Sequence, residues 1–142
     1  MGVQIRSIHP IAGAVLLALL ASCSEEVDLS AEQRDASLSW LAVVDAGEYS
    51  ESWGETSTLF QAAVSKSDWV QQVRGARGPL GSLSTRAQNQ AVFATNLPAA
   101  PDGNYIVITY DTSFGNKALA TETHTLYQES DGSWRTAGYF IK

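Results

Sequence analysis

The sequence has few of the residues that most often carry chemistry in proteins. Its 142 residues include a single cysteine, Cys23, and two histidines, His9 and His124. One cysteine cannot form a disulfide within the chain. A catalytic thiol needs a neighbouring base, and a structural zinc site usually needs four nitrogen or sulfur ligands. We therefore expect no metal and no cofactor, and the composition disfavours a nucleophilic cysteine.

Basic residues are scarce as well. Lys and Arg number 9 against 15 Asp and Glu, which gives a net charge of −6 and a pI of about 4.7. Nucleic-acid-binding proteins gain much of their affinity from basic side chains on phosphates. The charge balance therefore excludes nucleic acid as an expected partner. It also disfavours electrostatic attraction to an anionic membrane surface.

Long apolar runs are absent, apart from residues 11–21. This run follows Arg6, and as a helix it would rise only about 17 Å, against about 30 Å for the hydrocarbon core of a bilayer. A basic start followed by an apolar stretch of this length is typical of a secretory signal peptide. We predict that residues 1–22 are a signal peptide.

The apolar run ends in Leu20, Ala21, Ser22 and Cys23. These four residues resemble the lipobox of bacterial lipoproteins, in which the cysteine is lipidated and becomes the first residue of the mature chain. The resemblance implies a diacylglycerol and a further acyl chain, such as palmitate, on Cys23. Two or more membrane signals anchor a protein stably, so the membrane becomes a partner through this lipid. In such lipoproteins an Asp directly after the cysteine implies retention in the inner membrane. This chain has Ser24 at that position, so the resemblance implies the outer membrane, with the domain facing the periplasm.

Three regions follow from this interpretation: the signal at 1–22, the lipidated cysteine with an acidic tether at 23–29, and a single domain at 30–142. Six extended residues after Cys23 reach at most about 20 Å, so the tether would hold the domain close to the bilayer. Its acids either keep the tether off anionic headgroups or are simply solvated. The sequence does not decide between the two.

Within the domain, helical patterns come first and strand patterns follow. Ser30 and Gln33 match a capping box, and apolar residues recur every three or four positions until Gly47. Shorter helical patterns continue to the glycine-rich stretch at 75–81. Alternating apolar and polar residues then predict strands at 83–95, 105–112, 118–129 and 134–141. The expected fold is α+β, with N-terminal helices packed on a curved, four-stranded antiparallel meander.

Turn lengths give an expected strand register, with Thr112 near Ala118 and Ser130 near Ser133. The pairs expected to lie opposite each other are Ile106–His124, Ile108–Glu122, His124–Tyr139 and Leu126–Ala137. The other face carries many threonines, Thr136 among them, and suits water. The aliphatic face, expected to meet the helices, holds Ile106, Ile108, Tyr110, Glu122, His124, Leu126, Ala137, Tyr139 and Ile141.

Several segments between residues 38 and 142 resemble the bacterial family labelled domain of unknown function 4019. They include "VDAGEYSESW", "LFQAAVSKSDWV", "APDGNYIVITYDTSF" and "DGSWRTAGYFIK". The resemblance implies no established activity. The order of helices and meander is also similar to the NTF2-like, cystatin-like superfamily, whose members form a cone with a pocket between helices and sheet. Some of those members are enzymes and many are binding domains, so this likeness is a weak guide to function.

Candidate site residues follow from the aliphatic face and the aromatic side chains. Trp53, Tyr110 and Tyr139 are candidates for the wall of a pocket that binds a small apolar ligand, although aromatic residues at such spacing also form cores. Glu122 and His124 are the candidate catalytic pair, because a carboxylate on an apolar face is often functional. We expect a membrane-anchored envelope lipoprotein that binds a ligand or another envelope protein. The alternatives are a small pocket enzyme using Glu122 as acid or base, and a purely structural protein.

Overall fold

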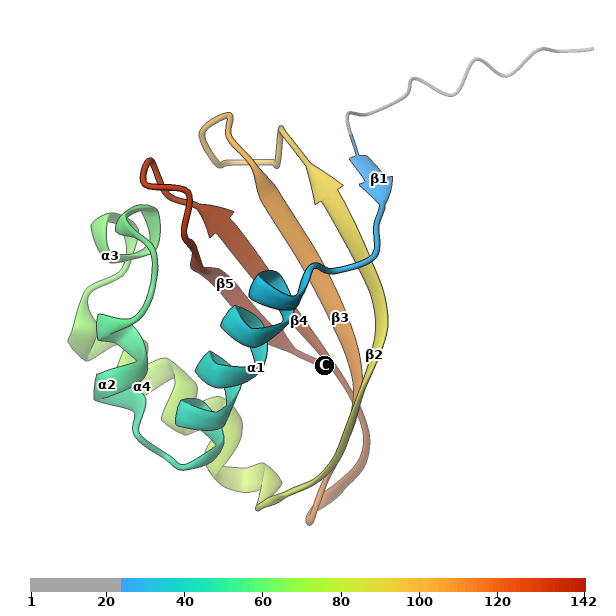
Figure 1. Cartoon of the computed structure of the whole chain (residues 1–142). Helices are drawn as coiled ribbons and strands as arrows, with labels where there is room; N and C mark the ends of the chain where they lie inside the picture. Colours follow the sequence, from blue (N-terminus) through green and yellow to red (C-terminus); the bar gives the residue numbers. More distant parts are fainter. Residues whose placement is uncertain (1–23) are drawn as a thin grey trace, which may run out of the picture.

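The computed structural model describes residues 24–142, so Cys23 and the expected signal peptide lie outside the described residues. The chain forms one antiparallel sheet with helices on one of its faces (Figure 1). Among the described residues no helix is long and apolar enough to cross a membrane. The strands follow one another in chain order across the sheet: β1 (Ser24–Glu26), β2 (Leu83–Ala94), β3 (Tyr105–Phe114), β4 (Lys117–Gln128) and β5 (Trp134–Ile141).

The sheet has five strands, so the expectation of four is wrong by one. The additional strand, β1, pairs with the end of β2, where Ser24 lies opposite Ala94 and Glu26 opposite Val92. The backbone N–H of Val27 continues this pairing by donating to the carbonyl of Ala91 at 2.9 Å. The segment expected as a tether therefore lies along the edge of the sheet. The sequence of β1 carries little strand signal, because acidic residues are uncommon in strands. The segment becomes a strand because the edge of β2 offers it hydrogen-bond partners.

Four helices and one 3-10 turn occupy the chain between β1 and β2. The first begins at a capping box, in which Ser30 Oγ accepts from the N–H of Gln33 at 3.2 Å and Gln33 Oε1 accepts from the N–H of Ser30 at 2.9 Å. It ends just before Gly47, whose φ of 79° few other residues adopt. The elements are α1 (Ala31–Asp45), α2 (Tyr49–Gly54), α3 (Thr58–Ala63), α4 (Lys66–Arg77) and η1 (Gly78–Leu80).

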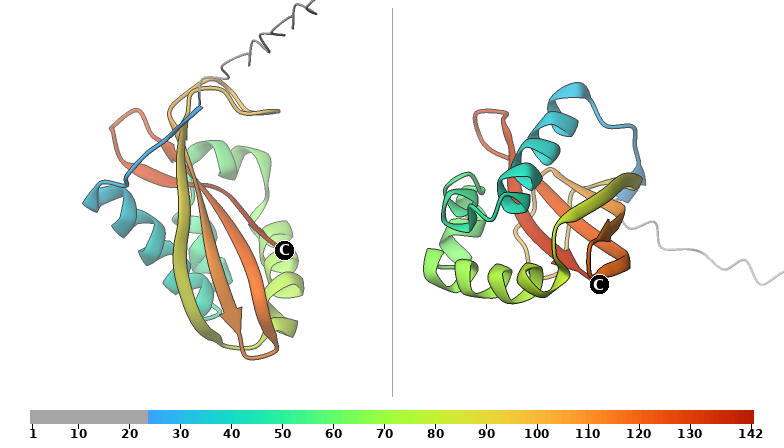
Figure 2. Two further views of the ribbon diagram at one scale, coloured as in Figure 1. Left: turned by 90° about the vertical axis from the view of Figure 1, so that its right-hand side faces the viewer. Right: turned by 90° about the horizontal axis from the view of Figure 1, so that it is seen from below.

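The core lies between α1 and the inner face of the sheet. Trp40, Leu41 and Val44 of α1 are buried against Ile106 and Ile108 of β3. Helices α2 and α4 pack against each other beside α1, and α3 lies against β5. Figure 2 shows α1 on one side of the curved strands with the other helices beyond the β5 edge. This arrangement confirms the α+β class and the helix-bearing face.

The predicted register between β3 and β4 is wrong by two residues. His124 lies opposite Ile108 and Glu122 opposite Tyr110. The strands run to Phe114 and from Lys117, so that Gly115 and Asn116 alone form the turn, and the expected five-residue loop is too long. A shift of two positions keeps every side chain on its predicted face.

Between β4 and β5 the pairing begins as predicted and then changes. His124 lies opposite Tyr139, but Leu126 lies opposite Thr136 and not Ala137. A register irregularity between Thr125 and Leu126 causes this change, and such a bulge re-aims the residues beyond it. Thr136, expected on the water-facing side, is instead buried.

Candidate functional site

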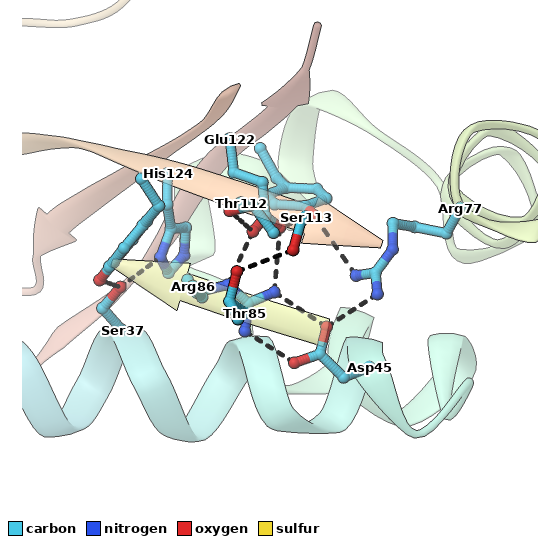
Figure 3. Close-up of polar contacts among 11 residues, drawn as sticks. Ser37, Asp45, Arg77, Thr85, Arg86, Thr112, Ser113, Glu122 and His124 are labelled. Atoms are coloured by element: carbon cyan, nitrogen blue, oxygen red, sulfur yellow. Dashed lines mark hydrogen bonds and ion pairs between the residues drawn. The ribbon is translucent and has the colours of Figure 1, made fainter. Parts of the chain in front are cut away.

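Two features of the described residues are candidates for function: a buried polar cluster under α1 and an apolar hollow on the outer face of the sheet. The buried cluster brings together four charged side chains from four elements. Asp45 ends α1, Arg77 ends α4, Arg86 lies on β2 and Glu122 lies on β4. Figure 3 shows Arg86 between the two carboxylates, with Arg77 reaching Asp45 from the far side.

Arg86 binds both carboxylates through paired hydrogen bonds. Its Nε donates to Glu122 Oε1 at 2.7 Å and its Nη2 to Glu122 Oε2 at 3.1 Å. Its Nη1 and Nη2 donate to Asp45 Oδ2 and Oδ1 at 2.7 and 2.9 Å. Because the planar guanidinium matches two carboxylates at once, Arg86 ties α1, β2 and β4 together.

Glu122 is completely buried, and both of its oxygens are occupied. Besides the bonds from Arg86, its Oε1 accepts from the hydroxyl of Thr112 at 2.7 Å, and its Oε2 accepts a short hydrogen bond from the hydroxyl of Tyr139. A buried charge of this kind is tolerated only when it is paired and hydrogen-bonded. The sequence places Glu122 on the inner face, and the structure supplies the partners that make this possible.

Arg77 completes the cluster. Its Nη2 donates to Asp45 Oδ1 at 2.8 Å, and its guanidinium carbon lies 4.7 Å from the centre of the Phe114 ring. Its Nε is buried and has no hydrogen-bond partner among the described residues. Arg77 thus forms an ion pair that joins α4 to α1.

His124 belongs to a neighbouring chain of hydrogen bonds. Its Nδ1 lies 2.7 Å from Ser37 Oγ, which in turn lies 2.7 Å from the hydroxyl of Tyr110. Its Nε2 lies 2.7 Å from Thr136 Oγ1. The imidazole also stacks on Trp40, with ring centres 4.8 Å apart. This chain therefore links α1 to β3, β4 and β5.

Burial shifts the pKa values of both groups of side chains. Complete burial, together with the charge of Arg86, lowers the pKa of His124 to about 3, so the imidazole is neutral at neutral pH and one ring nitrogen donates while the other accepts. Burial acts to raise the pKa of Asp45, but hydrogen bonds from Arg86 and Arg77 hold it below its usual range. Burial and the adjacent Glu122 raise the pKa of Tyr139.

The geometry of this cluster suits a structural role better than catalysis. Glu122 and His124 are both fully buried, and neither lines any of five prominent hollows on residues 24–142. A general acid or base must come within hydrogen-bond reach of a substrate, and here the hydrogen-bonding positions are taken by protein groups. No group of three or more His, Cys, Asp or Glu that could hold a metal occurs in this part of the chain.

The three aromatic residues expected at a pocket wall lie in or beside the core. Tyr110 is buried against Ser37, and Tyr139 packs edge-on against Trp40 at 5.4 Å between ring centres. Trp53 is half-buried, and its Nε1 donates to the carbonyl of Val64 at 2.8 Å. None of the three lines any of those five prominent hollows of the described residues.

Sequence reasoning missed Asp45 and Arg86. Arg86 lies in the polar stretch "LSTRAQNQ", where nothing distinguishes an inward-facing arginine from a solvated one. Asp45 is the last residue of α1, a position that the helix dipole disfavours for an acid. An acid at the C-terminus of a predicted helix is the one sequence signal that could have indicated a basic partner for Asp45.

The apolar hollow lies on the outer face of the sheet, between α3 and the loop at 97–101. It has a volume of about 560 Å³, within the range of about 300–1,000 Å³ typical of ligand pockets. Its floor comes from β3, β4 and β5, and no lining residue is charged. The lining residues are Leu59, Phe60, Ala62, Ala63, Val64, Leu97, Pro98, Ala99, Ala100, Pro101, Tyr105, Thr125, Ala137 and Gly138.

Both walls of the hollow are apolar and yet not buried. Helix α3 has the sequence TLFQAA and contains no buried residue. The loop opposite is held over the sheet by the hydroxyl of Tyr105, which donates to the carbonyl of Pro101 at 2.6 Å. Close packing also requires Gly103, where a Cβ would lie 2.8 Å from the Tyr127 ring. The fold thus fixes two partly exposed apolar walls on either side of an open space.

A larger hollow of about 830 Å³ lies between α2 and α4. Its lining includes Ser50, Ser67 and Gln71 with two basic residues, Lys66 and Arg74. Lys66 is already engaged with the Trp53 ring, at 5.4 Å from its centre. The two basic residues make this hollow a weaker candidate for a neutral apolar ligand.

Comparison with known proteins identifies the family. The sequence model of a protein family of unknown function, DUF4019, matches residues 36–139, and the chain belongs to that family. Neither the curated proteins nor the solved structures contain a match to the chain. The match covers the last two thirds of α1, every later helix and nearly all of strands β2–β5. The matched part of this chain contains both the buried polar cluster and the apolar hollow.

Proposed function

We propose that this protein is a membrane-anchored lipoprotein of the cell envelope whose domain binds a small apolar ligand in the hollow between α3 and the loop at 97–101. The observation that carries the binding proposal is the pair of partly exposed apolar walls around an uncharged space of about 560 Å³. Exposed apolar surface of this kind usually marks a place where a ligand or partner binds. Anchoring rests on the lipobox-like residues that end in Cys23.

The rigid cluster under α1 supports this function by fixing the floor of the hollow. Ion pairs and hydrogen bonds join α1 to β2 and β4, and His124 and Thr136 join β4 to β5. The bulge that turns Thr136 inward lies next to Ala137 and Gly138, which line the hollow. A site held on rigid elements loses less conformational entropy when it binds.

Neutral straight-chain alcohols are suitable probes, because no lining residue is charged. We expect octanol, nonanol and decanol to bind the chain that begins at Ser24, which contains every helix and strand of the fold. Each buried methylene contributes about 0.8 kcal/mol, so the dissociation constant should fall about fourfold per added carbon. Isothermal titration calorimetry measures this series.

A matched pair of tryptophan variants locates the binding. Ala63→Trp places a large side chain in the hollow at an exposed position of α3, whereas Ala118→Trp changes an exposed position of β4 that lies outside the hollow. The first variant should weaken decanol binding at least tenfold, and the second should leave it unchanged. Affinity that is independent of alcohol length, or equal in both variants, would refute the proposal.

A further inference from the structure

We infer that the ligand of the hollow is the acyl chain of a bilayer lipid, and that the domain sits on the membrane with the end of the sheet carrying β1 and the loop at 97–101 against the bilayer. This inference rests on the proposed function, because it names the ligand of the same hollow and requires the lipid on Cys23. It follows from where the anchor meets the sheet.

The strand register fixes the distance between the anchor and the hollow. Ser24 lies opposite Ala94, and Ala94 lies opposite Tyr105, which lines the hollow. Neighbouring strands are about 4.8 Å apart, so the Cα atoms of Ser24 and Tyr105 are about 10 Å apart. Cys23 is the next residue along the chain, within about 4 Å of Ser24. The lipid attachment point therefore lies roughly 15 Å from the wall of the hollow at most.

Because β1 is paired with β2, no flexible segment separates Ser24 from the folded domain. Ser24 already belongs to the sheet, and Leu29 is buried in the core. A lipid on Cys23 would thus hold one particular end of the domain at the bilayer. Figure 1 shows that β1 and the loop between β2 and β3 occupy the same end of the molecule, opposite the hairpin between β3 and β4.

The surface at this end is suited to the apolar side of an interface. The loop from Leu97 to Pro101 contains no charged or hydrogen-bonding side chain, and Pro98, Ala99 and Pro101 are exposed. Ala99 has a φ of 60°, which the loop maintains although a residue with a Cβ disfavours it. An exposed apolar loop beside an open apolar hollow, both next to a lipid anchor, fits an acyl chain that enters from the membrane.

Acidic residues around this end define which lipids suit it. Glu25, Glu26 and Asp102 are exposed beside the loop, and they repel anionic headgroups over about 10 Å at moderate salt. The recognised chemistry is therefore the acyl chain, below a headgroup without net negative charge. Phosphatidylcholine is the appropriate probe lipid.

Fluorescence quenching by brominated lipid tests the inference on the full lipidated protein in phosphatidylcholine vesicles. The chain has one cysteine, which lipidation consumes, so an introduced cysteine is the single free thiol. A bimane label at Thr123→Cys, two residues from the lining residue Thr125 on the same face of β4, reports on the hollow without filling it. A label at Asn96→Cys, which is exposed and does not line the hollow, reports on the loop, and one at Ala118→Cys reports on the opposite end. With brominated acyl chains we expect at least twofold quenching at positions 123 and 96 and none at 118.

The remaining outcomes separate this inference from the proposed function. If decanol binds but bromine quenches position 96 only, the loop touches the bilayer while the hollow takes another ligand, and the inference fails. If decanol changes the emission of the label at position 123 while bromine quenches neither site, the ligand does not come from the bilayer, and the inference also fails. If decanol does not bind at all, the proposed function fails with it. Protein that does not float with the vesicles overturns the inference at its first step.

Discussion

At the scale of single residues, the burial of His124 should make the free energy of unfolding depend on pH. The imidazole has a pKa near 6.5 when unfolded and of about 3 when folded. Between about pH 3 and pH 6.5 the unfolded chain binds more protons than the folded chain. The contribution of His124 to the free energy of unfolding is therefore complete above about pH 6.5 and decreases as the pH falls. The slope reaches about 1.4 kcal/mol per pH unit for one proton.

Replacing His124 with glutamine removes this titration. We expect the free energy of unfolding of the wild-type chain from Ser24 to fall between pH 6.5 and pH 4, and that of His124→Gln to stay nearly level over the same range. Urea unfolding at a series of pH values measures both slopes. Asp45, whose pKa is lowered in the folded state, is present in both chains, so its contribution to the slope cancels in the comparison. Equal slopes for the two chains would show that His124 is not buried as a neutral ring.

Arg86 is the residue on which the buried cluster depends most. Arg86→Met leaves Glu122 fully buried without its cation and leaves Asp45 with one ion pair. Removing one partner of a buried ion pair costs about 3–5 kcal/mol, and we expect a loss of that size in urea unfolding. Arg74→Met, an exposed change on α4, should alter stability by less than about 0.5 kcal/mol. Similar small losses in both variants would contradict the structural role of the cluster.

At the scale of elements, the helix signals in the sequence were the most reliable. Ser30 and Gln33 form the predicted capping box, and Gly47 follows the end of α1 as expected. These signals are local, since each depends on residues three or four positions apart. The sheet was predicted by type and by face, but β1 was missed, because its pairing depends on the edge of a strand nearly seventy residues away in the chain.

The cap on α1 gives an element-scale prediction. Ser30→Ala removes the oxygen that accepts from the N–H of Gln33, so the chain should lose about 1 kcal/mol of unfolding free energy. Ser84→Ala, a serine exposed on β2, serves as the matched control and should change stability by less than about 0.5 kcal/mol. A loss that is no larger in Ser30→Ala than in the control would mean that the cap contributes nothing. Thermal or urea unfolding distinguishes the two.

At the scale of the whole molecule, the sequence predicts a location for the protein but no ligand. The prediction of a lipid anchor rests on Cys23 and the residues just before it, and it needs no structure. The hollow could not be predicted, because its walls come from α3 and from a loop about forty residues further along the chain. The sequence predicts only a short helix for the first segment and a turn for the second, and nothing in it indicates that the two lie near each other. Only the fold shows that neither is buried and that they face each other.

The attachment at Cys23 is the central claim of the account, since the position of the domain at the membrane follows from it. Mass spectrometry of the N-terminal peptide, from protein isolated in the cell envelope, tests this claim most directly. We predict a peptide that begins at Cys23 and carries the mass of a diacylglycerol and an additional acyl chain, and we predict that Cys23→Ser yields unlipidated protein that retains residues 1–22. A wild-type peptide that begins elsewhere, or that begins at Cys23 with an unmodified thiol, would contradict the account.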